Sequence, residues 1–227
     1  MNLGQLAARV SAVASINNDS GSEEQGLLYA WANEGVREVL LKTHCYVEIG
    51  DALVTAGVGD YRLDVDMLAI VDKTLTSSNQ QSTFEQINSA DLLLMRRTTG
   101  SSPARYFALL GHDLLMIYPT PDLADTVRYF FVPLPTEMTL TTHDPSQSPY
   151  GGIPVWGHKA IEHYMLMQAY QKDGTRSGQA ELRQEQLFDK ECAKITHFMR
   201  GKGGRTLSAA RLGGSQMPFV NHRNDVY

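Results

Sequence analysis

The apolar positions at the start of the chain recur every three to four residues, as on one face of a helix. Residues 2–16 carry the first such pattern, which stops at the polar, glycine-containing run 17–21. Ser22 is a typical N-cap and Gln25 completes a capping box, so a second helix is predicted from there to about His44. The two apolar stripes are Leu3, Leu6, Ala7, Val10, Val13 and Ala14, and then Leu28, Trp31, Ala32, Gly35 and Val39.

A glycine lies inside the stripe of the second predicted helix. Gly35 costs about 1 kcal/mol relative to alanine in a helix interior. Two interpretations remain open, the close approach of another helix and a glycine tolerated at the surface.

The hydrophobic period changes to two between Tyr46 and about Thr142. Residues 46–50 and 63–67 alternate apolar and polar positions, and 68–71 has the composition of a buried strand. A polar loop or hairpin tip follows, and then a short strand and a short helix. These are predicted over 76–83, 84–87 and 90–97 respectively. Five or six strands are expected in this part of the chain.

An antiparallel meander is predicted over residues 98–141. Its three apolar runs span 105–110, 114–118 and 126–132, and Gly111-His112-Asp113 has the composition of a tight hairpin connection. The aromatic residues of these runs are interleaved with few cations, which favours packing over stacking on nucleic acid bases. Met116, Tyr106, Tyr118, Leu114 and Tyr129 are expected to supply that packing, with His112 exposed at the hairpin tip.

Two further helices are predicted beyond the linker 143–154, which is rich in Pro, Gly and Ser. Pro154 suits a first helical turn, and Gly174 is a suitable C-cap. The next helix is predicted from Ser177 to about Met199 and should end sharply at the glycines of 201–204. The expected inward faces are Trp156, Ala160, His163, Tyr164 and Met167, and then Ala180, Gln184, Leu187, Phe188, Cys192 or Glu191, Ile195 and Phe198.

These patterns predict an α+β fold. We expect a four-helix bundle with an antiparallel β-sheet insertion between helices 2 and 3, and an extended C-terminal tail, because each helix has one apolar stripe to bury. Trp31, Trp156 and Tyr164 should share the core of the bundle. The expected units are 1–45 and 154–200 for the two halves of the bundle, 46–142 for the β insertion domain, and 201–227 for an extended C-terminal docking arm.

Composition narrows the class of protein. The chain has 227 residues, of which 42% are hydrophobic and 20% charged, as in a globular protein that can bury a sizeable core. No apolar run approaches the roughly 20 residues of a membrane span, and the N-terminal segment lacks the features of a secretory signal. The two cysteines, Cys45 and Cys192, are too few for a disulfide framework and suit buried thiols in a reducing compartment.

Charge is distributed unevenly along the chain. The net charge is −5, but residues 200–227 carry +4, which leaves −9 on the remainder. Apolar residues are spaced along this basic segment, a combination typical of a segment that orders on binding a partner, although a solvated terminus is the alternative. The candidate partner-binding residues are Arg205, Leu207, Arg211, Leu212, Met217, Phe219, Val220, Arg223 and Tyr227, together with His112 at the hairpin tip.

Candidate catalytic groups are sparse. His158 and His163 are five residues apart, about 140° around a helix, and do not suit a shared metal. Cys192 and His197 have the same spacing. A small hydrolase using His163 or Cys192 is kept as an alternative function, but no enzyme, metal or cofactor is expected.

The serial order of motifs between 20 and 200 resembles the head-to-tail adaptor (connector) proteins of tailed bacteriophages. The similar features are the segment 61–70, the threonine-glycine turn with Pro103, the glycine hairpin, and Tyr118-Pro119-Thr120-Pro121-Asp122 followed by an aromatic strand. The resemblance implies a helical bundle that carries a β domain between its second and third helices. It differs at Asp64, where the family commonly has proline.

The resemblance also implies a structural virion protein without catalysis. Such a protein forms a homo-oligomeric ring, typically of twelve copies, that joins the portal vertex to the tail or its nozzle and terminator proteins. Double-stranded DNA would pass through the lumen during ejection without sequence readout, past an acidic wall that repels it. Assembly in the cytoplasm of the bacterial host and a place in the virion neck would follow, with no membrane contact. Another ring-forming neck or tail component is the remaining alternative.

Overall fold

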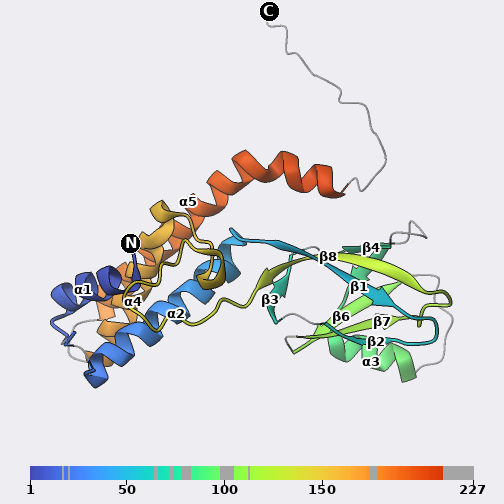
Figure 1. Ribbon diagram of the computed structural model, residues 1–227, viewed down its shortest axis with the longest axis horizontal. Helices are drawn as coiled ribbons and strands as arrows, with labels where there is room; N and C mark the ends of the chain where they lie inside the picture. Colours follow the sequence, from blue (N-terminus) through green and yellow to red (C-terminus); the bar gives the residue numbers. More distant parts are fainter. Residues whose placement is uncertain are drawn as a thin grey trace, which may run out of the picture.

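The computed structural model describes residues 1–16, 18–19, 21–63, 66–71, 74–77, 83–97, 105–111, 113–173 and 178–211. These residues form five α-helices, two short 3-10 helices and eight β-strands, which confirms the predicted α+β class. The strands lie between the second and fourth helices along the chain. Figure 1 shows the helical part and the β part side by side in an elongated molecule.

The two N-terminal helices begin at capping residues. Helix α1 spans Leu3–Ala14. At its start the Asn2 side chain accepts a hydrogen bond from the Gln5 N–H, and the Gln5 side chain accepts one from the Asn2 N–H. Helix α2 spans Glu23–Thr43, and the Ser22 hydroxyl accepts from the Gln25 N–H as expected. The Gln25 side chain accepts instead from the N–H of Gly21, one residue before the cap. All five residues of the predicted α2 stripe are buried.

Helices α1, α2, α4 (His158–Asp173) and α5 (Gly178–Arg211) share one apolar core. Helix α4 packs closely against α2 at Gly35, where a Cβ would lie 3.2 Å from both Ile161 Cγ2 and Tyr164 Cδ1. The glycine therefore permits a close helix approach. The buried members from the four helices include Leu3, Leu6, Val10, Leu28, Trp31, Val36, Val39, Leu40, Ala160, Ile161, Met165, Phe188, Cys192 and Ile195.

Eight strands make up the β part, with hydrogen-bonded order β1-β8-β4-β5-β6-β7-β2 and β3 also paired with β8. Their bounds are β1 Glu48–Val54, β2 Asp60–Arg62, β3 Met67–Ile70, β4 Thr74–Ser77, β5 Thr83–Gln86, β6 Tyr106–Leu110, β7 Leu114–Tyr118 and β8 Asp125–Pro133. A second apolar core lies here, built from the inward side chains of β1, β7, β8 and their neighbours. The number of strands exceeds the five or six predicted.

The meander prediction is confirmed for its first two strands only, because the third strand, β8, pairs with β1, β3 and β4 and not with β7. Strands β6 and β7 form the expected antiparallel hairpin, with Leu110 opposite Leu114 and Gly111 at φ +68°. Strand β5, however, pairs with β6 in parallel. Helix α3 (Ser89–Arg97) connects these two strands, and a parallel pair needs such a crossover. The predicted short helix is thus present, whereas a purely antiparallel sheet is not.

Three expectations for the C-terminal helices are wrong. Trp156 is 42% exposed and not in the core. Residues Val155–Gly157 form a 3-10 turn before α4 begins at His158, and three residues per turn do not continue an α-helical stripe. The buried face of α4 is therefore His158, Ala160, Ile161, Met165, Leu166 and Ala169.

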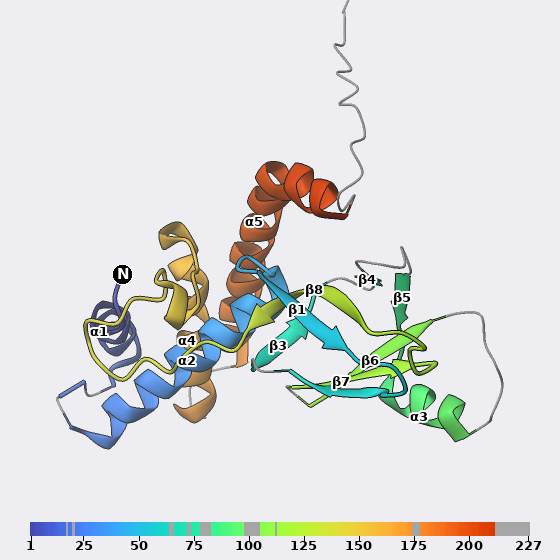
Figure 2. The ribbon, with the colours of Figure 1, turned by 45° about the vertical axis from the view of Figure 1, so that its right-hand side comes forward.

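Helix α5 also differs from the prediction. Phe198 is 41% exposed instead of inward-facing. The helix does not stop at Gly201 but continues through the glycines to Arg211. Each glycine costs about 1 kcal/mol, a cost that strong helix formers on either side can offset. Both ribbon views show the C-terminal part of α5 bending away from the other helices (Figures 1 and 2).

Candidate partner-binding surfaces

The predicted docking residues fall only partly within the described structure. Arg205, Leu207 and Arg211 belong to the C-terminal part of α5, which projects from the helical core (Figure 2). His112 and the remaining predicted residues lie outside the described residues. Those remaining residues are Leu212, Met217, Phe219, Val220, Arg223 and Tyr227.

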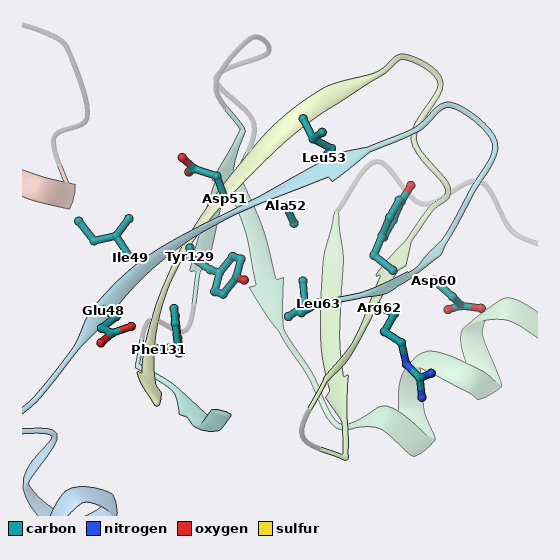
Figure 3. Close-up of a pocket in the computed structure, with 12 residues that line it drawn as sticks. Glu48, Ile49, Asp51, Ala52, Leu53, Asp60, Arg62, Leu63, Tyr129 and Phe131 are labelled. Atoms are coloured by element: carbon teal, nitrogen blue, oxygen red, sulfur yellow. The ribbon is translucent and has the colours of Figure 1, made fainter. Parts of the chain in front are cut away.

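A groove separates the two outermost strands of the β part. Strands β1 and β2 are consecutive along the chain, yet they occupy opposite ends of the hydrogen-bonded order and do not pair with each other. The groove between them has a volume of about 540 Å³ (Figure 3). Its lining consists of Glu48, Ile49, Gly50, Asp51, Ala52, Leu53, Asp60, Tyr61, Arg62, Leu63, Tyr129 and Phe131.

The floor of the groove is apolar. Tyr129 and Phe131 from β8 lie under it, with ring centroids 5.5 Å apart, and Leu63 contributes from the β2 side (Figure 3). The three side chains are buried. Gly50 stands opposite Tyr129 in the β1–β8 register, and a Cβ there would lie 2.3 Å from Tyr129 Cζ. The missing side chain at Gly50 therefore allows the Tyr129 ring to fill this place.

Strand β1 presents large apolar side chains at the edge of the sheet. Ile49 is 61% exposed and Leu53 is 79% exposed, and both lie on the outward face of the strand. Only β8 pairs with β1 among the described residues. A seven-residue edge strand with exposed apolar side chains is a template for pairing with another chain.

Charged residues border the groove. Arg128 pairs with Asp51 through two bonds, 2.9 and 3.2 Å long, and lowers the pKa of that carboxyl group. The Glu48 carboxylate accepts a 2.6 Å bond from the Tyr46 hydroxyl, which raises the pKa of the tyrosine. Of the charged residues that line the groove, Asp51 pairs with Arg128, Asp60 with Arg96 and Arg62 with Asp113, so Glu48 supplies the net negative charge of the lining.

A tyrosine fixes the connection between β1 and β2. The Tyr61 hydroxyl donates toward the carbonyl oxygens of Thr55, 2.9 Å away, and Val58, and it accepts from the Thr55 N–H. Burial raises the pKa of Tyr61, so the hydroxyl stays protonated. This end of the groove is therefore closed by an ordered turn, and Glu48 lies toward the opposite end (Figure 3).

A second apolar surface lies on the helical part. Val155 is 63% exposed, and the Trp156 ring meets Phe198 edge-on, with centroids 4.8 Å apart. Gly157, beside them, lets Ile195 of α5 pack against the turn, since a Cβ would lie 3.0 Å from Ile195 Cδ1. Three exposed apolar side chains held on an ordered turn and a helix mark a surface suited to a protein partner.

The groups considered for catalysis are placed for structural roles. Burial raises the pKa of the Cys192 thiol to about 12, so it holds its proton at neutral pH and is a poor nucleophile. His163 bonds through Nδ1 to Gln184 Oε1 at 2.8 Å, linking α4 to α5. The fully buried His158 accepts from the Met1 amino group at 2.8 Å, and burial lowers its pKa.

Two further properties concern the described residues as a set. None of their helices is long and apolar enough to cross a membrane. In the same part of the chain, His, Cys, Asp and Glu side chains do not gather in groups of three or more that could hold a metal ion.

The model of the SU10 adaptor protein family matches residues 1–211. The chain belongs to this family. The adaptor is therefore a structural head-to-tail connector protein of a bacteriophage, located at the virion neck. A search of curated proteins found no match.

The groove and the aromatic surface of the adaptor were not predicted from its sequence. Alternation marked β1 as a strand but carries no information on which edge stays unpaired. Trp156 was assigned to the core because its spacing matched a helix. Pro154 marks the start of helical structure, but the sequence does not show that the first turn after it is a 3-10 turn.

Proposed function

We propose that the adaptor assembles into a ring, of about twelve copies by family resemblance, which joins the portal vertex to the tail and lines the DNA conduit. Family membership over residues 1–211 is the observation that carries this proposal. A head-to-tail ring needs two different surfaces on each subunit, because the contacts are heterologous. The β1 edge and the surface formed by Val155, Trp156 and Phe198 are two such surfaces on separate parts of the molecule.

The conduit role is supported by charge. Residues 1–199 carry −9, whereas the segment from Arg200 onward carries +4. A negatively charged wall repels the phosphate backbone and lets DNA pass without adhering. In this proposal the acidic body faces the lumen and the basic segment is engaged with protein.

We assign the docking role to residues 201–227. The helical part of this segment, up to Arg211, contains Arg205 and Leu207, and the C-terminal part of α5 projects from the other helices (Figure 2). Weak contacts repeated around a ring add up to a strong joint, because each subunit raises the effective concentration of the next.

Imaging of the adaptor mixed with its portal tests the ring. We expect added density on the portal with the symmetry of a closed ring, and unaltered portals would contradict the proposal. A ring that forms without the portal and binds only tail components would favour another neck or tail protein.

Variants separate the two surfaces. Trp156→Ser should fold and fail to form the ring, while Leu182→Ser, at a 56% exposed position on α5 away from the Trp156 surface, should leave the ring intact. Equal assembly by both variants would show that the aromatic surface is not an interface.

Deletion after Gly201 tests the C-terminal arm. The shortened chain should attach less well to the portal, and unchanged attachment would mean that the arm is not the docking element.

A further inference from the structure

The groove between β1 and β2 has the form of a site for an extended segment. One side is the free edge of β1, which offers backbone N–H and C=O groups along seven residues. The floor is apolar, formed by Tyr129, Phe131 and Leu63. Recognition by strand addition uses these two features together, the edge for affinity and the pockets for alternate side chains.

We propose that the segment around Met217-Pro218-Phe219-Val220 of a neighbouring copy binds in this groove as an added strand on β1. The inference rests on the proposed ring, which brings neighbouring copies together. The apolar part of the C-terminal arm would therefore bind to another copy of the adaptor.

The sequence of the segment matches the groove. In a strand, Met217 and Phe219 share one face and would enter the apolar floor, while Val220 lies on the other face beside Ile49 and Leu53. In a strand, the backbone N–H and C=O groups of alternate residues point to the same neighbouring strand. If residues 217 and 219 bond to β1, the backbone groups of residue 218 therefore point away from β1. Pro218, which lacks an N–H, is tolerated at such a position.

Charge and reach favour a second copy as the source. Arg211 and Arg223 flank the apolar stretch, and Glu48 is the lining carboxylate available to them, since Asp51 and Asp60 already pair with Arg128 and Arg96. Glu48 lies at the end of the groove away from the β1–β2 turn (Figure 3). Its carboxylate accepts a hydrogen bond from the Tyr46 hydroxyl. Helix α5 ends at Arg211, and the six residues from there to Met217 can span up to about 20 Å, so the groove that receives the segment belongs to a subunit packed directly against this one.

A photo-cross-linking experiment identifies the occupant directly. Leu53, 79% exposed on β1, is replaced by benzoylphenylalanine in the full-length chain, and this chain is mixed with full-length chain labelled with ¹⁵N. The mixture is irradiated with and without the portal, and cross-linked peptides are identified by mass spectrometry. Leu123, 63% exposed in the turn before β8 and not part of the groove lining, carries the same probe in the control.

The expected product joins residue 53 of one chain to the 216–222 region of the other isotopic form, and the probe at Leu123 does not give it. Met217→Ser with Phe219→Ser in the labelled chain should reduce this product by about tenfold or more, since each tenfold corresponds to about 1.4 kcal/mol of binding. Cross-links to the portal, to the same chain only, or to no peptide would overturn the inference. If a ring is imaged on the portal but this cross-link is absent, the strand-addition inference is overturned and the proposed function is not. If the ring is absent as well, the inference and the proposed function are both overturned.

Discussion

The two tryptophans of the adaptor provide matched probes of folding and assembly. They are the only tryptophans in the sequence. Trp31 of α2 is 8% exposed in the helical core, and Trp156 is 42% exposed beside Phe198. We predict that Trp31→Ala destabilises the isolated subunit strongly, and that Trp156→Ala destabilises it less but abolishes assembly.

The difference in stability follows from buried area. A tryptophan side chain can bury about 250 Å², so the two exposed fractions leave about 230 Å² buried for Trp31 and about 145 Å² for Trp156. At ~25 cal/mol per Å², the 85 Å² difference corresponds to about 2 kcal/mol. With Trp31→Ala costing about 4–5 kcal/mol, Trp156→Ala should cost about 2–3 kcal/mol. The gap in Tm should be about 4–8 °C for a chain of this size.

Urea denaturation and calorimetry of the isolated subunit measure these costs. Equal destabilisation by the two substitutions would refute the assignment of Trp156 to a partly exposed surface. Trp31→Phe leaves Trp156 as the single reporter, and acrylamide should quench its fluorescence in the free subunit and much less once the ring forms. Trp156→Phe is the control, because the buried Trp31 should be poorly quenched in both states.

Three further predictions concern residues of the helical part. Burial lowers the pKa of His158 below the ordinary 6.5, so the unfolded chain binds more protons than the folded chain at acidic pH. The free energy of unfolding should therefore fall as the pH drops below about 6.5. Urea titrations at several pH values measure this decline, and His158→Asn should flatten it. Cys192, with a pKa of about 12, should resist iodoacetamide at pH 8 in the native protein and react in urea; rapid native alkylation would show an exposed thiolate. Gly26→Ala should stabilise α2 by about 0.5–1 kcal/mol, because the space around the new Cβ is open. Gly35→Ala should be less stable than Gly26→Ala by about 1–2 kcal/mol, because the new Cβ would press against Ile161 and Tyr164. Equal gains would mean that α4 moves aside at no cost.

Local patterns were sufficient for several elements. The stripe of α2 and its Ser22 cap depend on spacing within a few residues, and Gly111 marked the β6–β7 hairpin because a positive φ favours glycine. Helix α3 was also predicted at nearly its observed bounds, Ser89–Arg97. The order of motifs indicated the adaptor family, which the match over residues 1–211 confirmed.

The tertiary structure decided which segments distant in sequence became neighbours. Strand alternation shows which side chains of β1 share a face, but the choice of β8 as its neighbour depends on how the whole sheet closes, which left the opposite edge and the groove open. The exposure of Trp156 depends on a 3-10 turn whose hydrogen bonds are not visible in a hydrophobic pattern. The sequence by itself therefore determined the elements, their caps and the family, because these depend on local spacing and order. The tertiary structure alone decided which edges and aromatic side chains remain free to meet a partner, because that depends on contacts between distant segments.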